Sequence, residues 1–198
     1  MDAIETEEYN GYNIKIFIDE DAYSPREDDN LCQLHCWHKR MNIGDKDCNY
    51  VLDYDRDQQR YDEVMKDAKR NKDIILPLYI YQHGGVTISL TPFSCPWDSG
   101  QVGYVIIPRK KSLDEFSRKR MSKKFREKVV GIAKAEIETY DQYLRGDVYG
   151  YKIEDAEGEE TDDSCWGFYG TECCMEEAKS VVDYYEKQNS QETKKVVL

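Results

Sequence analysis

The stretch Ile74-Ile-Leu-Pro-Leu-Tyr-Ile-Tyr-Gln82, followed by Val86-Thr-Ile-Ser-Leu90 and Gln101-Val-Gly-Tyr-Val-Ile-Ile-Pro108, determines the fold class of this chain. The three segments are rich in Val, Ile and Tyr, which favour strands, and Gly-rich or Pro-rich turns separate them. Their connections are shorter than the crossover of about a dozen residues that parallel strands need. The block therefore predicts an antiparallel meander.

Further elements are predicted on both sides of this block. Strands are expected at Tyr12–Ile18, Leu31–His38 and Val148–Glu154. Apolar residues at helical spacing predict helices at Arg56–Lys72, from Ser122 to Leu144, and at Thr171–Lys187. Ser112 and Glu115 have the spacing of a capping box and predict the start of a short basic helix. Residues 1–10 are expected to be a frayed acidic leader, and 155–163 a mobile loop.

The expected fold class is α+β, with an antiparallel sheet packed with three to four helices. A length of 198 residues suits one domain, and no linker or internal repeat interrupts the sequence. Residues 1–187 are therefore predicted to form a single domain. Residues 188–198 are predicted to be a disordered C-terminal tail.

Charge is distributed unevenly along a chain whose net charge is −12. Residues 1–30 have a net charge of −8 and residues 154–163 a net charge of −7, whereas residues 109–128 have a net charge of +7. Such runs are often solvated faces, but an acidic surface also favours docking on a basic partner. The overall sign disfavours nonspecific binding of nucleic acid by the whole protein.

Seven cysteines in a chain without a signal-like N-terminus favour reduced thiols over a disulfide framework. Cys32 and Cys36, or Cys173 and Cys174, lack the second knuckle that a structural zinc site needs. No apolar run approaches the roughly 20 residues that cross a bilayer. We expect a protein of the host-cell cytoplasm, without membrane contact, cofactor or metal.

The loop Asp19–Asn30 contains six acidic residues and a Ser-Pro step, which neither a helix nor a strand explains. Its carboxylates could bind a hard cation, although the EF-hand spacing is missing. Alternatively the loop is capped internally, with Arg26 paired to one or two carboxylates. Asp19, Asp21, Ser24 and Arg26 are the candidate binding residues of this loop.

Two further stretches break their local patterns. The Gly-rich and Pro-rich loops around His83 and at Pro92–Gly103 place Trp97 and Asp98 at a tip, either as a binding hot spot or as a cover for the end of the sheet. Cys95 and His83 could form a thiolate–imidazole pair, but chance pairs are common here and no catalytic residue is predicted. In Cys165-Trp-Gly-Phe-Tyr-Gly170, Trp166 and Tyr169 either stack on a ligand or pack in the core.

These stretches resemble a family found in phages, prophages and conjugative elements. The resemblance rests on the following segments: Asp21–Glu27, Asp29–Leu31, His38–Arg40, Gly44-Asp45, Leu76–Tyr81 with His83, Pro92–Gly103, Gly146–Gly150 and Cys165–Gly170. It covers roughly residues 12–170, and His38 joins the candidate binding residues through it. The family resemblance implies a genomic setting, not a mechanism.

No P-loop, Rossmann, H-E-x-x-H or G-x-S-x-G signature occurs, which argues against familiar enzyme classes. Our leading hypothesis is an accessory factor that inhibits a host defence system, with CRISPR–Cas as the candidate, by stoichiometric binding to a basic, nucleic-acid-binding host protein. The alternative is a nucleotide sponge or small nucleotide hydrolase with a pocket between Asp19–Arg26, His83 and Trp97–Asp98. A third hypothesis places nucleic acid on the basic helices of residues 109–128.

Overall fold

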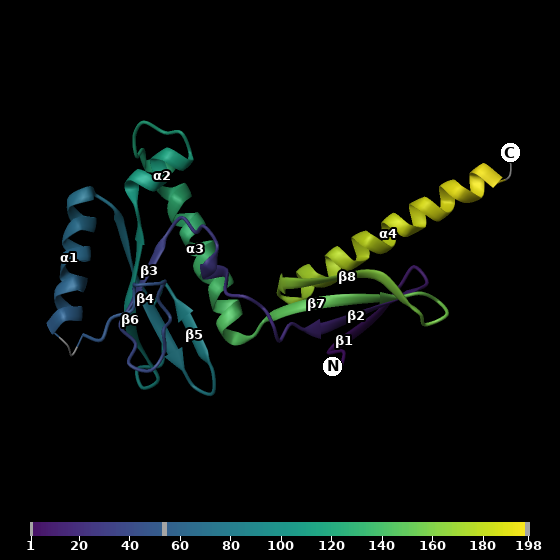
Figure 1. The fold of residues 1–198 in the computed structure, drawn as a ribbon, viewed down its shortest axis with the longest axis horizontal. Coiled ribbons are helices and arrows are strands. Elements are labelled where there is room, and N and C mark those ends of the chain that lie inside the picture. Colours follow the sequence, from purple (N-terminus) through teal and green to yellow (C-terminus); the bar gives the residue numbers. More distant parts are fainter. Residues whose placement is uncertain (1, 53–54, 197–198) are drawn as a thin grey trace. The chain divides into compact units, whose positions relative to one another are not determined.

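The computed structural model describes residues 2–52 and 55–196, apart from the side chains of 162 and 189–196. The strands are β1 Glu5–Tyr9, β2 Tyr12–Ile18, β3 Gln33–Cys36, β4 Ile74–Gln82, β5 Val86–Ser89, β6 Ser99–Ile107, β7 Val148–Glu154 and β8 Glu160–Tyr169. The helices are α1 Asp55–Asn71, α2 Arg109–Glu115, α3 Lys123–Arg145 and α4 Thr171–Val196, with a 3₁₀ turn η1 at Pro25–Glu27. The predicted α+β class, with antiparallel strands and four helices, is confirmed (Figure 1).

The strands are divided between two four-stranded antiparallel sheets, and the chain has two compact units around them. Unit 1 consists of residues 1–23 and 142–198, and unit 2 of residues 24–141. The chain therefore begins in unit 1, forms all of unit 2, and then returns to complete unit 1.

The sheet of unit 1 has the strand order β1-β2-β7-β8, and α4 packs on one face of it. Ile14 pairs with Ile153, and Ile16 with Tyr151, so these four side chains point to the same face. Their partners on α4 are small or flexible apolar residues, namely Cys174, Met175, Ala178 and Val182. This apolar layer is the core of unit 1.

Two ends of unit 1 differ from the sequence expectation. The acidic segment Glu5–Tyr9 is not frayed, because it pairs along its length with β2 as an edge strand. Its glutamates tolerate this position because an edge strand leaves most of its surface in solvent. At the other end, α4 continues past Lys187 to Val196, a segment without glycine or proline to end the helix. Residues 197 and 198 of the predicted tail lie outside the described residues.

The sheet of unit 2 has the strand order β3-β6-β4-β5 and lies between α1 and α3 (Figure 1). Tyr61 of α1 contacts the rings of Trp37, Tyr50 and Tyr104. The predicted apolar stripe of α3 is confirmed, since Phe125, Val129, Ala133, Ile137 and Tyr140 are all buried.

The start of α2 differs from the predicted capping box. Ser112 lies inside the helix, and its fully buried hydroxyl donates to the carbonyl oxygen of Pro108 at 2.9 Å. Helix α2 begins earlier, at Arg109, and Pro108 is its N-cap residue, with extended backbone and no side-chain cap. Ser122 does cap α3, as its Oγ accepts the N–H of Phe125 at 3.2 Å. Among the described residues, no helix has the length and apolar content to cross a bilayer.

Candidate functional site

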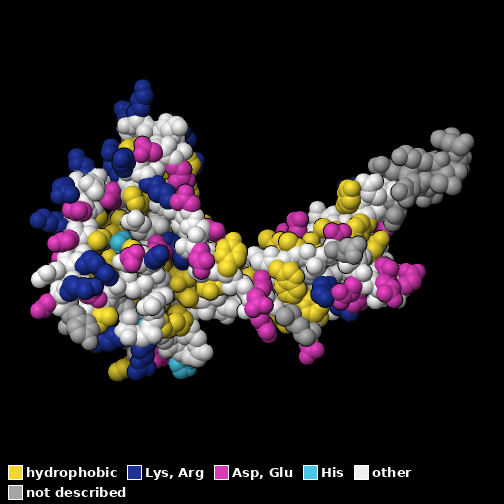
Figure 2. Space-filling model, viewed as in Figure 1, with side chains coloured by type: hydrophobic (Ala, Val, Ile, Leu, Met, Phe, Trp, Pro, Cys, Tyr) yellow, Lys and Arg dark blue, Asp and Glu magenta, His cyan; other side chains and the backbone are white. Residues whose placement is uncertain are grey.

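The two units differ sharply in charge. Unit 1 has 21 acidic and seven basic residues, a net charge of −14, whereas unit 2 has 19 acidic and 21 basic residues, a net charge of +2. Figure 2 shows acidic side chains gathered at the turn between β7 and β8. The acidic surface that the sequence predicts is therefore concentrated on unit 1.

The turn between β7 and β8 is held by hydrogen bonds between its backbone N–H groups and the Asp155 side chain. The Oδ1 atom of Asp155 accepts the N–H groups of Glu157 at 3.0 Å and Glu159 at 2.9 Å. Gly158 has a φ of +84°, which glycine adopts without strain. Asp155 is thus used internally, while Glu157 and Glu159 stay exposed. The segment 155–163, predicted to be a mobile loop, is a hairpin turn followed by the first residues of β8, and the turn presents two carboxylates to solvent.

Next to this turn, Trp166 forms part of a hollow of about 520 Å³. The indole packs over Gly150, where a Cβ atom would collide with it, and its ring centroid is 6.2 Å from that of Phe17. The ion pairs Lys15–Glu154 and Lys152–Glu160, the second at 3.0 Å, line the hollow. Trp166 is 39% exposed, so it retains apolar surface for a partner within an acidic surrounding.

The other candidate residues of unit 1 have structural contacts. Asp19 accepts the N–H of Asp21 at 3.2 Å through Oδ1, and its own N–H donates to the Val148 carbonyl at 2.8 Å. Tyr169 ends β8 opposite Val148. Asp21 is exposed. Asp19 therefore shapes the turn that leaves β2.

Arg26 is the centre of a buried polar network in unit 2. Its guanidinium donates to both carboxylate oxygens of Asp45, at 2.8 and 2.9 Å, to Oδ1 of Asn30 at 2.9 Å, and to the Cys32 carbonyl at 2.9 Å. Burial alone lowers the pKa of Arg26, but the hydrogen bonds and charge of Asp45 raise it above its usual value. The side chain is 6% exposed, so Arg26 is a structural residue.

The same network ties α3 to the loop that precedes β3. The Glu136 carboxylate accepts the N–H groups of Leu31 at 2.6 Å and Cys32 at 3.0 Å. These two hydrogen bonds explain why an acidic residue, Glu136, lies among the apolar residues of α3. Ser24 caps the turn η1 by accepting the N–H of Arg26 at 3.2 Å. The sequence alternative of an internally capped loop fits Ser24 and the Arg26–Asn30 contact, but the carboxylate paired with Arg26 is Asp45, which lies outside the loop.

Four candidate residues of unit 2 gather near Gln82, at one end of β4. His38 Nε2 lies 3.1 Å from Gln82 Oε1, and the Gln82 N–H donates to the Asp98 carbonyl at 2.8 Å. His83 Nδ1 lies 3.3 Å from Asp98 Oδ2. Trp97, next to Asp98, is 90% exposed. Its indole therefore does not cover the sheet, and it is available to a partner.

In unit 2, Cys95 is not paired with His83, and Cys32 and Cys36 are buried. The contact of the Cys95 thiol is the Asp98 carboxylate at 3.9 Å, not the His83 imidazole. Burial raises the pKa of the Cys32 and Cys36 thiols, which keeps them protonated. Within residues 2–52 and 55–196, no group of three or more metal-ligating side chains is close enough to hold an ion.

Sequence reasoning missed one feature, a basic hollow formed by the loop that joins α2 to α3 and by the start of α3. Its signal was present as the net charge of +7 over residues 109–128. What the sequence did not show is that part of this run encloses a cavity. Comparison of the chain with family models, curated proteins and solved structures finds no match.

Proposed function

We propose that this protein is a phage or mobile-element accessory factor that inhibits a host defence system by stoichiometric binding, with a CRISPR–Cas effector as the candidate target. One observation carries the proposal: unit 1 combines a net charge of −14 with a half-exposed indole beside an acidic turn. The motif resemblance to a mobile-element family supports the biological setting.

The chemistry of this surface suits a basic partner. Carboxylates at the rim speed association with a positively charged groove, while a partly exposed tryptophan supplies apolar area that water leaves on binding. Glu157 and Glu159 lie on the turn, and Trp166 lines the neighbouring hollow. A groove that normally holds nucleic acid has the required charge. Binding of unit 1 there would compete with the nucleic acid.

The alternative hypothesis, a nucleotide pocket near Arg26, requires the Arg26 guanidinium to be free to bind a phosphate. Each nitrogen of the Arg26 guanidinium donates to an acceptor within unit 2, and the side chain is buried. Releasing it for a phosphate would leave the Asp45 carboxylate without its charge partner. His83 and Asp98 remain accessible, but they offer no second cation to such a ligand.

The test is complex formation between the full chain and a panel of purified CRISPR–Cas effectors, measured by size-exclusion chromatography and calorimetry. We expect a one-to-one complex whose affinity falls as salt rises, because the rim charges are screened. The E157Q/E159Q variant should weaken the complex about tenfold or more. The matched E176Q/E186Q variant removes the same charge from exposed positions on α4 and should change the affinity little.

A Trp166→Ala variant tests the apolar part of the surface, and Trp97→Ala tests the separate exposed indole of unit 2. Loss of binding with the first and retention with the second would assign the interface to unit 1. A panel in which no effector binds, or binding that neither salt nor E157Q/E159Q weakens, would refute the proposal.

A further inference from the structure

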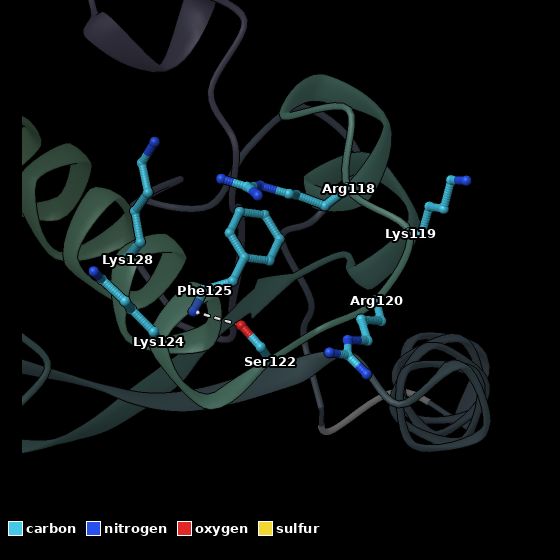
Figure 3. A pocket seen from close by; sticks show the side chains of 7 residues that line it. All are labelled: Arg118, Lys119, Arg120, Ser122, Lys124, Phe125 and Lys128. Carbon is cyan, nitrogen blue, oxygen red and sulfur yellow. Dashed lines mark hydrogen bonds between the residues drawn. The ribbon is translucent and has the colours of Figure 1, made fainter.

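The loop that joins α2 to α3 and the first two turns of α3 enclose a hollow of about 650 Å³ (Figure 3). Its walls are Arg118, Lys119 and Arg120 from the loop, and Lys124 and Lys128 from α3. In Figure 3 the Lys119 and Arg120 side chains lie on the opposite side of Phe125 from Lys124 and Lys128. Five cations from two segments therefore surround one cavity.

The charge of this hollow is not compensated within the protein. No carboxylate is among its lining residues, and within the described part of the chain none of the five cations forms an ion pair. The acids nearest in sequence, Asp114, Glu115 and Glu127, do not line it. All five residues are exposed, so water screens part of their mutual repulsion, and a bound anion would offset what remains.

The floor of the hollow is a buried aromatic ring. Phe125 is 6% exposed and packs against Phe116 edge to face, with ring centroids 5.6 Å apart. The Lys128 ammonium lies 4.1 Å from the Phe116 ring centroid, so a cation–π contact orients this side chain. Ser122 fixes the start of α3, and the positive end of this 23-residue helix adds to the field of the side chains.

We propose that this hollow binds a compact oligophosphate, such as the linked phosphates of a nucleoside triphosphate or of inorganic triphosphate. Arginine forks and lysine ammonium groups around a concave floor match several phosphate oxygens at once. An extended nucleic acid fits less well, because unit 2 without these five cations has 16 basic and 19 acidic residues and so offers no continued excess of positive charge to a long polyanion. A ligand confined to the hollow needs no such excess outside it.

This inference is independent of the proposed function, because it concerns residues of unit 2 that take no part in the surface of unit 1. Either can fail without the other. The probe for the hollow is therefore a small phosphate compound, and no effector protein enters the experiment.

The experiment is isothermal calorimetry of the full chain with inorganic triphosphate, ATP, orthophosphate and a short single-stranded oligonucleotide at low salt. We expect one triphosphate per chain, with an affinity that falls steeply as salt rises. The R118Q/K124Q/K128Q variant should weaken binding about tenfold or more. The matched K66Q/K69Q/K72Q variant removes three exposed cations from α1 and its end in the same unit, and should weaken it less than about twofold.

The comparison between ATP and triphosphate identifies the source of the ligand. Tighter binding of ATP would indicate a nucleotide, and equal binding would indicate that the phosphates alone are recognised. Any one of three results would overturn the inference: no binding of triphosphate, equal weakening of binding by both triple variants, or an oligonucleotide that binds more tightly than triphosphate. Circular dichroism of each variant confirms that a loss of binding is not a loss of folding.

Discussion

One cluster of basic residues in unit 2 differs from the basic residues of unit 1. In unit 1, Lys15, Arg145, Lys152 and Lys179 each pair with a carboxylate. In unit 2, the five cations around the hollow have no carboxylate partner among the described residues. Pairing within an acidic unit is expected from proximity alone, whereas an unpaired basic cluster in a protein of net charge −12 is not. The unpaired cluster is therefore the stronger indication of a ligand.

The interiors of the two units also differ. Unit 1 is held together by an apolar layer between α4 and its sheet. Unit 2 adds a buried polar network in which Arg26, Asp45 and Glu136 join three segments that are distant in sequence. Apolar layers tolerate conservative changes, but a buried ion pair does not tolerate the loss of one partner. The units should therefore respond differently to mutation.

The largest expected effect comes from Arg26→Met, which leaves the Asp45 carboxylate without its cation. We expect the free energy of unfolding to fall by about 3–5 kcal/mol. Hydrogen exchange should show lost protection in β3 and β6 but not in β2 and β7, because the network lies within unit 2. Arg70→Met is the control, since it removes an exposed partner of Asp67. Equal loss of protection in both sheets would show that the units unfold together.

A pair of glycine variants compares the two sheets directly. A Cβ atom at Gly103 would collide with the backbone carbonyl of His35 on β3, which cannot move without breaking the strand pair. A Cβ atom at Gly150 would collide chiefly with the Trp166 ring, a side chain rather than backbone, and would approach the Cys165 carbonyl oxygen to 2.9 Å. We expect G103A to lower the unfolding free energy by about 3 kcal/mol and G150A by about 1 kcal/mol.

Urea denaturation measures the unfolding free energy of both variants, and tryptophan fluorescence emission reports on the Trp166 ring in G150A. Displacement of the Trp166 ring in G150A should shift the emission to longer wavelength, because the indole gains solvent contact. If G150A is as destabilising as G103A, the Trp166 ring is held as firmly as a strand backbone, and the comparison between the sheets fails.

The smallest effect is a pH dependence confined to unit 2. Burial lowers the pKa of His35, whose Nδ1 lies 2.8 Å from the Tyr50 hydroxyl in the core. The unfolded state therefore binds the proton more readily, and stability is lost as pH falls below the unfolded value of about 6.5. The slope should not exceed about 1.4 kcal/mol per pH unit. His35→Gln should reduce the slope between pH 7 and 5.5.

Strands with strong local patterns could be predicted closely from the sequence. Tyr12–Ile18, Ile74–Gln82 and Val148–Glu154 have the predicted bounds, and Ser122 caps the long helix. Each depends on residues close together in the chain. The division into two sheets could not be predicted, because it depends on Ile16 pairing with Tyr151, and nothing local specifies that pairing. Residues Glu5–Tyr9 likewise form a strand only because β2 offers an edge.

Candidate residues were predictable by type more readily than by role. Trp97 and Trp166 are exposed enough to contact a partner. Arg26 is buried and does not face a partner. Its burial could not be predicted, because the residue it pairs with, Asp45, lies 19 positions away in the sequence. The hollow between α2 and α3 was visible only as a basic run, since the arrangement of its side chains depends on the turn that joins the helices.

The order in which the chain visits its units has a consequence for biosynthesis. Residues 24–141 leave the ribosome as a complete unit, whereas the first two strands must wait for β7 and α4. During that interval Ile14 and Ile16 have no apolar cover, and their hairpin is open to pairing with other chains. The glutamates of Glu5–Tyr9 place negative charge on the other edge of this hairpin, which discourages pairing there during the interval.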